Sequence, residues 1–262
     1  MPHSLITNIG DGNVVKMECH ESLPSAYELA RMYAKHGYPD KYVVFSERQT
    51  RFSASGEIIK PGTSERGVYL SLILRPSIFP SQASFLGPIS AVALITALEE
   101  HTAKSLGLGW ISDVYCEGRK IGGTTTEGML DNFSTYEYII INFSVRLSDS
   151  DFPPRLNDLI KKVFESENTS ISMIIAKNIL SKFFALYPRS LKSAEKVMEI
   201  FKKKFILAGT KITYSENGRK KRAKIIAVDS DDASLIVSAR GGKIKRIISR
   251  RDLDIPRKIK LK

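Results

Sequence analysis

A lysine, an aspartate and a pair of glycines in the middle of the chain have the clearest chemical potential. Asp113 precedes a turn at Glu117-Gly118, and Lys120 and the Gly122-Gly123 pair follow it. A lysine ammonium can hold a carboxylate or phosphate oxygen, and an aspartate can bind a metal–nucleotide complex. Two glycines within a strand allow a ligand to approach the backbone closely. An ordinary surface hairpin with a solvated lysine explains the same residues, and the residues alone leave both interpretations open.

Hydrophobic periodicity predicts the elements that would position these groups. The predicted strands are Val14–Cys19, Tyr42–Ser46, Val68–Leu74, Trp110–Cys116, Arg119–Thr125 and Tyr136–Leu147. The first helix is expected to start at Ser22-Leu23-Pro24, with Ser22 as its cap, and to end at His36-Gly37. Further helices are predicted over Phe85–Leu106, Pro153–Glu165, Ile171–Leu186 and Ser190–Phe205.

The pattern changes after Ala208-Gly209 to short strands separated by glycine turns. These strands are predicted over Lys211–Tyr214, Ala223–Val228, Ser234–Ser238 and Lys243–Ser249. Their spacing is typical of a small barrel. We therefore expect an α+β chain with a large domain over residues 1–205 and a small SH3-like β-barrel over residues 206–262.

The positive charge of the chain is concentrated in this last segment. The formal net charge is +12, and residues 201–262 hold 19 Lys and Arg against 6 Asp and Glu, whereas the remainder holds 21 against 22. Such a basic surface favours an acidic partner, either an acidic protein or nucleic acid, although a solvated basic surface is an equal alternative. Tyr214 is the only aromatic residue of the predicted barrel, so nucleic-acid binding by base stacking is disfavoured.

No secretory signal and no apolar run of membrane-spanning length is expected from the sequence, which favours a cytoplasmic protein without membrane contact. Cys19 and Cys116 lie far apart and lack metal-ligand spacing with the four histidines, so we interpret both as structural thiols. No helix-turn-helix is visible before the first predicted strand, so a DNA-binding repressor role is not expected. Pairing of two copies through sheet edges is compatible with this fold class, but the sequence does not specify it.

Several motifs of the chain, taken in order, resemble those of the biotin protein ligases. The family's Trp-Pro-Asn-Asp-hydrophobic segment and its Gly-Lys-Lys-hydrophobic-Ala-Gly segment resemble Trp110–Val114 and Gly118–Gly123, with a Glu soon after at Glu127. Its other motifs resemble Ser22-Leu23-Pro24, Gln49-Thr50, Arg66–Ser71 and the segment from Ala208 to Asp254.

The resemblance implies a biotin/lipoate ligase-like catalytic domain and a two-step reaction. The biotin carboxylate attacks the α-phosphate of ATP with Mg²⁺ assisting, and a lysine of an acidic biotin carboxyl carrier domain then attacks the biotinyl-adenylate. The catalytic residues it implies are Lys120 and Asp113. The biotin-binding residues it implies are Ser22, Gln49, Thr50, Tyr69, Lys120 and Gly123. The ATP-binding residues it implies are Ser112, Asp113 and Arg51. No metal ligands are specified.

The chain departs from the family pattern at positions expected to face the ligand. Phe52–Glu57 stands where the family has a Gly-Arg-rich adenylate loop, and Leu23-Pro24 replaces Thr-Asn. Ile140 stands where a glycine would let the ligand lie against the backbone, and Ser112 replaces an asparagine. The prediction is a biotin–carrier protein ligase with an atypical adenylate loop. The alternatives are a ligase-like binding or regulatory protein without adenylation, or a ligase or transferase for a related acid such as lipoate.

Overall fold

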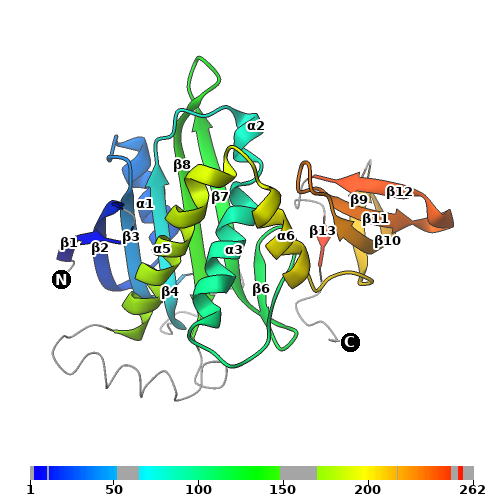
Figure 1. Cartoon of the computed structure of the whole chain (residues 1–262), viewed down its shortest axis with the longest axis horizontal. Coiled ribbons are helices and arrows are strands. Elements are labelled where there is room, and N and C mark those ends of the chain that lie inside the picture. Colours follow the sequence, from blue (N-terminus) through cyan, green and yellow to red (C-terminus); the bar gives the residue numbers. More distant parts are fainter. Residues whose placement is uncertain are drawn as a thin grey trace.

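The computed structural model describes residues 3–10, 12–51, 65–147, 170–216, 218–248 and 253–255. They form an eight-stranded sheet in the order β1-β2-β3-β4-β8-β7-β6-β5 and a five-stranded sheet in the order β12-β11-β10-β9-β13 (Figure 1). The first sheet consists of β1 His3–Asn8, β2 Val14–Leu23, β3 Tyr42–Gln49, β4 Glu65–Leu74, β5 Leu106–Leu108, β6 Asp113–Cys116, β7 Arg119–Leu130 and β8 Tyr136–Arg146. The α+β prediction is confirmed.

The large sheet is mixed, because β2 and β3 run parallel and its other neighbouring strands pair antiparallel. A parallel pair needs a crossover connection, and α1 (Ala26–Lys35) provides it. Successive residues of β8 point to opposite faces, so Ile139 and Ile141 join one apolar cluster while Tyr138 and Ile140 join another. The sheet therefore has two covered faces, one under α1 and one under the remaining helices.

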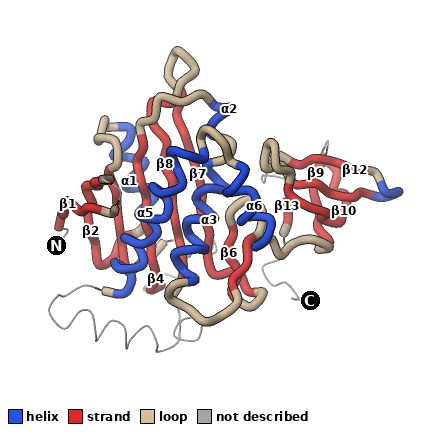
Figure 2. The backbone as a smooth tube through the Cα atoms, viewed as in Figure 1, coloured by secondary structure: helices blue, strands red, loops and turns tan. Residues whose placement is uncertain are grey.

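The remaining helices lie together across the other face of the large sheet (Figure 2). They are α2 Pro80–Ala83, α3 Leu86–Glu99, α5 Ile171–Ser190 and α6 Glu195–Lys204. The stretch Pro80–Glu99 is long and apolar enough to cross a membrane by length and composition alone, so the expectation that no run has this length was wrong. Core helices pass the same test, and 61% of this stretch is buried inside the protein. Packing between the sheet and α5 explains why α3 is apolar on all sides.

The first helix starts three residues later than the sequence pattern suggested. Ser25 is the N-cap of α1, and its Oγ accepts a hydrogen bond from the backbone N–H of Glu28 at 3.2 Å. Ser22 lies in β2 opposite Arg48 of β3, so its assignment as the cap was wrong. The segment Ser-x-x-Glu over residues 25–28 is the usual signature of a helix start and would have given the correct position.

Other boundaries differ for local reasons. The helix predicted over Phe85–Leu106 ends at Glu99, because Leu106–Leu108 form the edge strand β5. The helix predicted to begin at Ser190 begins at Glu195, and the preceding helix α5 extends to Ser190. The strand β1 was not predicted, and the predicted helix Pro153–Glu165 lies outside the described residues.

The small sheet forms a separate C-terminal β module that contacts the large one. Its strands are β9 Lys211–Glu216, β10 Arg219–Val228, β11 Leu235–Ala239, β12 Ile244–Ile247 and β13 Leu253–Asp254. The backbone N–H of Ile206 donates to the Leu108 carbonyl at 3.0 Å, and the Trp110 indole N–H donates to the Ala233 carbonyl at 2.8 Å. The module is thus bonded to the segment that leads directly into β6.

Candidate functional site

The hairpin of β6 and β7 brings Asp113 and Lys120 together, as expected from their positions on either side of the Glu117-Gly118 turn. Asp113 opens β6, Lys120 is the second residue of β7, and the lysine Nζ lies 3.0 Å from the aspartate Oδ1. The two side chains are 4% and 15% exposed, so the pair is largely withdrawn from water. Removing two charges from water costs several kcal/mol each unless they are paired. This partly buried pair is therefore a more specific feature than the solvated lysine of a surface hairpin.

Gly123 and Ser112 are needed by the hairpin itself. A Cβ at Gly123 would lie 2.6 Å from the Ser112 carbonyl oxygen, so the backbones could not pair with any larger residue there. The Ser112 hydroxyl donates to the Thr124 carbonyl at 2.7 Å and is buried. The resemblance implies ligand contacts for both residues. The structure shows a second reason for a glycine and a serine at these positions, because both stabilise the hairpin.

The end of β3 and the start of α1 form the second part of the site. The Gln49 Oε1 accepts from the backbone N–H of Ala26 at 3.4 Å, and the Gln49 side chain is buried. The backbone N–H groups of Thr50 and Arg51 donate to the carbonyls of Leu23 and Pro24 at 3.0 and 3.1 Å. The chain leaving β3 is thereby fixed against the chain entering α1.

Ser22 and Arg51 occupy the exposed rim of this second part. Ser22 is exposed near the end of β2. Ser25 is buried, and it directly precedes Ala26, whose backbone N–H donates to Gln49. Arg51 lies with its Nη1 2.9 Å from the Glu28 Oε2, and both side chains are about half exposed (58% and 43%). Ser25 is therefore a buried hydroxyl of this region that was not assigned from the sequence. The Ser-x-x-Glu signature over residues 25–28 would have identified it.

The face under α1 is filled by apolar side chains. Ala26, Ala30 and Ala34 let the helix lie close to the sheet, where Tyr69 and Ile140 are buried beneath it. The exposed fractions of those two residues are 1% and 0%. Ile140 therefore occupies space on this face, as its replacement of the family's glycine predicted.

Two tyrosines border this packed cluster. The Tyr27 hydroxyl on α1 donates to the Glu127 Oε2 on β7, which joins the first turn of the helix to the far side of the face. The Tyr138 hydroxyl is buried without a hydrogen-bond partner among the described residues, and burial raises the pKa of this phenol. A buried orphaned hydroxyl is costly, so Tyr138 marks a place where a polar ligand atom would be favourable.

Strand register brings the two parts of the site to one end of the sheet. Arg48 of β3 pairs with Ser22 of β2 on one side and with Arg66 of β4 on the other. Farther along the sheet, Gly67 of β4 pairs with Arg146 of β8, and the neighbouring Val145 pairs with Gly122 of β7. Lys120 lies two residues before Gly122, beyond the same end. Arg48, Arg66 and Arg146 thus lie near the ends of neighbouring strands, at the end of the sheet where Lys120 lies, and alternation directs Arg66 and Arg146 to opposite faces. The segment Phe52–Glu57, which replaces the family's arginine-rich loop, lies outside the described residues.

Residues 61–144 match the family model described as the biotin/lipoate A/B protein ligase family. The bifunctional ligase/repressor BirA of Bacillus subtilis is 27% identical over 153 residues, which are 58% of this chain and 47% of that protein. The BirA of Bacillus spizizenii is 23% identical over 230 residues, which are 87% of this chain and 70% of that protein. The chain therefore spans about half the length of the first of these relatives.

Solved biotin protein ligases have the same fold over nearly the whole chain. The Aquifex aeolicus enzyme superposes with a TM-score of 0.63 at 16% identity, covering 91% of this chain and 96% of that one. A biotin protein ligase-like protein of unknown function from Silicibacter superposes with a TM-score of 0.61 at 14% identity, covering 89% and 94%. The family match over residues 61–144, the two BirA relatives and the shared fold together support membership of the biotin protein ligase family.

Proposed function

We propose that this protein attaches biotin to a lysine of an acidic carrier domain, using ATP to form biotinyl-adenylate as the intermediate. The observation that carries the proposal is the partly buried Lys120–Asp113 pair, 3.0 Å apart, in the hairpin whose sequence resembles the family's ligand-binding motifs. The reaction brings two anions together, a carboxylate and a phosphate. Catalysis therefore requires positioning and charge neutralisation more than covalent work by the protein.

In this proposal, Lys120 holds the biotin carboxylate beside the α-phosphate, where negative charge develops on the phosphoryl oxygens. Asp113 orients the lysine and faces the ATP–Mg²⁺ side. Mg²⁺ is usually bound by one or two carboxylates, substrate phosphates and waters, and the described residues contain no cluster of three potential metal ligands. A single carboxylate such as Asp113 fits a metal that arrives with the nucleotide and shields its phosphate charge. Gln49 and Thr50 would border the polar ring of biotin, together with Ser22, and Tyr69 and Gly123 would line the pocket.

Positive charge for the adenylate is available without the usual loop. Arg146 is the last residue of β8, at the end of the sheet where Lys120 lies, and alternation along the strand places it on the same face as Ile140. The Arg146 Nε is buried without a hydrogen-bond partner among the described residues. Hydrogen bonds between guanidinium and phosphate contribute about 1.5–3 kcal/mol each, so one such arginine offsets part of the missing loop. Arg51, exposed beside Glu28, is the other candidate for ATP binding.

The packed face under α1 favours a second candidate function. Ile140 and Tyr69 are buried there, and the Tyr138 hydroxyl has no hydrogen-bond partner in the described part of the chain. This suits an acid ligand of a different shape from biotin, or a relative that no longer adenylates. The solved relatives with bound biotin and with biotin and ATP share the fold with this chain. Biotin is therefore the first ligand to test.

The direct test is transfer of labelled biotin to a carrier domain from the same source, with and without ATP. The expected result is label on the carrier that requires ATP, Mg²⁺ and the carrier lysine. Lipoate and octanoate should be run in parallel as competing acids. Label from lipoate in preference to biotin would establish the related-acid alternative. Absence of label with any acid, from a sample that is folded by circular dichroism, would contradict the ligase proposal.

A further inference from the structure

The C-terminal β module has a strongly basic outer face whose cations form no ion pair with the carboxylates that the structure describes. Alternate residues of β10 point outward, so Arg222 and Lys224 are exposed while Ala223 and Ile225 are buried. They line an open groove of about 810 Å³ together with residues of β9 and β11. We call the lining cations and hydroxyls the basic face, which consists of Lys211, Thr213, Arg222, Lys224, Ser238 and Arg240.

Strand register forces like charges together on the basic face. Lys224 pairs directly with Lys211 of β9 on one side and with Ser238 of β11 on the other. Like charges directly opposite one another on a sheet are destabilising. Within the described part of the chain, none of the four cations of the basic face forms an ion pair with a carboxylate. A bound anion would relieve this repulsion.

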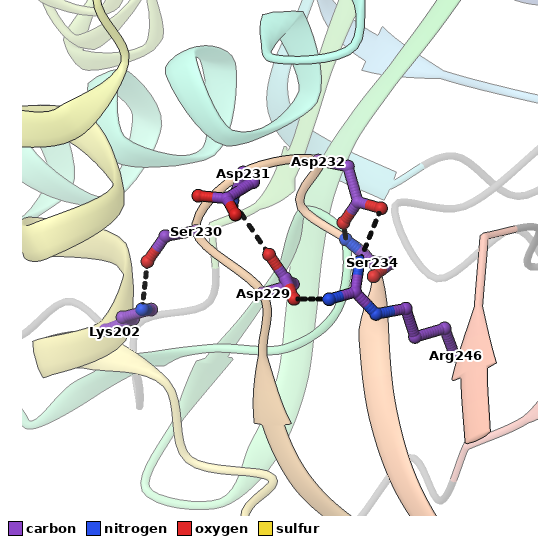
Figure 3. Close-up of polar contacts among 7 residues, drawn as sticks. All are labelled: Lys202, Asp229, Ser230, Asp231, Asp232, Ser234 and Arg246. Atoms are coloured by element: carbon purple, nitrogen blue, oxygen red, sulfur yellow. Dashed lines mark hydrogen bonds and ion pairs between the residues drawn. The ribbon is translucent and has the colours of Figure 1, made fainter. Parts of the chain in front are cut away.

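Three acidic residues of the module, Asp229, Asp232 and Glu216, are engaged elsewhere. Asp229 and Asp232, in the turn between β10 and β11, both form ion pairs with Arg246 of β12 (Figure 3). Ser230 of the same turn accepts a hydrogen bond from Lys202 of α6. Glu216 binds Lys221 and Lys245, and these two lysines hold the pKa of its carboxyl down at about 2. Asp254, whose backbone pairs with Thr213, is the acidic residue nearest in register to the basic face.

We propose that the basic face binds the sugar–phosphate backbone of a nucleic acid. Lysine, arginine, serine and threonine are the side chains that usually contact phosphate and sugar oxygens, and this face combines all four. Residues two apart on a strand lie about 6.7 Å apart, so Arg222 and Lys224 can meet successive phosphates of an extended strand. Among the residues that the structure describes, no aromatic side chain lines the groove. This argues against base stacking but not against backbone contact, so binding should be independent of sequence.

An acidic protein segment is the competing occupant, and the hydroxyls favour nucleic acid over it. Thr213 and Ser238 lie between the cations, opposite Arg222 and Lys224. Neutral hydroxyls add donors for closely spaced phosphate oxygens and complete the set of side chains that usually contacts phosphate and sugar. This inference concerns the outer face of the module and does not depend on the proposed ligase activity.

The test is fluorescence anisotropy of the full chain with a labelled single-stranded DNA of about twenty nucleotides. With about four phosphate contacts, log Kd should change with log salt by a slope of roughly 3 between 50 and 200 mM. The triple variant Lys211→Gln, Arg222→Gln, Lys224→Gln should bind at least about tenfold more weakly and lose roughly 2 from that slope. All three residues are exposed, so the fold should be retained.

A matched control removes the same charge from another exposed region. Lys192→Gln, Lys196→Gln, Lys203→Gln changes three exposed lysines of α6 and the segment before it. This control should change the affinity less than about threefold if the basic face is the binding site. Equal losses in both triple variants would overturn the proposal in favour of net charge alone. It would also be overturned if polyglutamate displaced the DNA at equal charge concentration, because the face would then be a docking surface for acidic protein.

Discussion

The two faces of the large sheet are packed differently although the same strands form them. Under α3, α5 and α6, the alternate residues Ile139, Ile141 and Phe143 of β8 belong to one continuous apolar core. Under α1, the intervening residues Tyr138 and Ile140 belong to a small cluster with tyrosines and alanines. That cluster has Glu127 and Tyr27 at its border. The first face is built for stability, and the second has the mixture of apolar packing and polar ends expected of a ligand site.

The largest expected effect on the α1 side comes from Lys120. Lys120→Met removes the charge that the proposal places against the carboxylate and phosphate, and it leaves Asp113 partly buried without this partner. Loss of one such transition-state contact costs about 10²–10³ in rate. ATP-dependent carrier labelling should fall by that factor while biotin still binds, as measured by calorimetry. Labelling within about threefold of the wild-type rate would remove Lys120 from the mechanism.

The packing difference can be tested at two adjacent residues of β8. Ile140→Ala and Ile141→Ala should each lower the free energy of unfolding by about 2–5 kcal/mol, because both side chains are fully buried. Only Ile140→Ala opens space on the α1 face, so only it should strengthen biotin binding. Denaturant titration checks the stabilities, and calorimetry checks the affinities. A similar change of affinity in both variants would show that the two faces are not functionally distinct.

Arg146 tests whether a strand arginine supplies the charge of the absent loop. Arg146→Gln should reduce ATP-dependent labelling by about 10–100-fold, the equivalent of one charge-assisted contact to phosphate. Its effect should appear mainly as a higher apparent KM for ATP rather than for biotin. Arg75, which donates to the carbonyls of Tyr38, Ala34 and Glu137, offers a comparison because its guanidinium is structurally engaged. If Arg75→Gln changes the KM for ATP as much as Arg146→Gln does, the assignment of Arg146 is wrong.

On the face of the large sheet opposite α1, a substitution of Trp110 tests the hydrogen bond that joins the large domain to the C-terminal β module. Trp110→Phe removes the indole N–H that donates to the Ala233 carbonyl and leaves this acceptor buried. The free energy of unfolding should fall by about 1–3 kcal/mol, measured by denaturant titration. The salt slope of DNA binding should not change, because the basic face lies elsewhere on the module. A loss of DNA binding would show that the module requires this bond to hold its fold.

The smallest expected effect distinguishes two serines at the start of the α1 side. Ser25→Ala removes the N-cap of α1 and should lower the free energy of unfolding by about 1 kcal/mol. Ser22→Ala should lower it by less than about 0.5 kcal/mol, because Ser22 is exposed in β2. If biotin contacts Ser22 as the resemblance implies, Ser22→Ala will weaken biotin binding without affecting stability. An equal loss of stability in both variants would contradict the observed position of the cap.

The sequence by itself determined the fold class, most elements of the large domain and the hairpin that contains Asp113 and Lys120. Those features depend on local periodicity, turn residues and charge, which a single chain displays directly. The concentration of charge after residue 200 was visible in the same way, and the domain boundary near residue 206 stays a prediction.

Only the tertiary structure decided which residues meet. Ser22 lies in β2 opposite Arg48 because pairing with β3 extends β2 to Leu23. Gly123 and Ser112 turned out to serve the hairpin, since backbone approach across β6 and β7 depends on register. The pairing of Lys224 with Lys211 is likewise a consequence of register. Contacts between strands far apart in sequence are set by long-range packing, which no local pattern specifies.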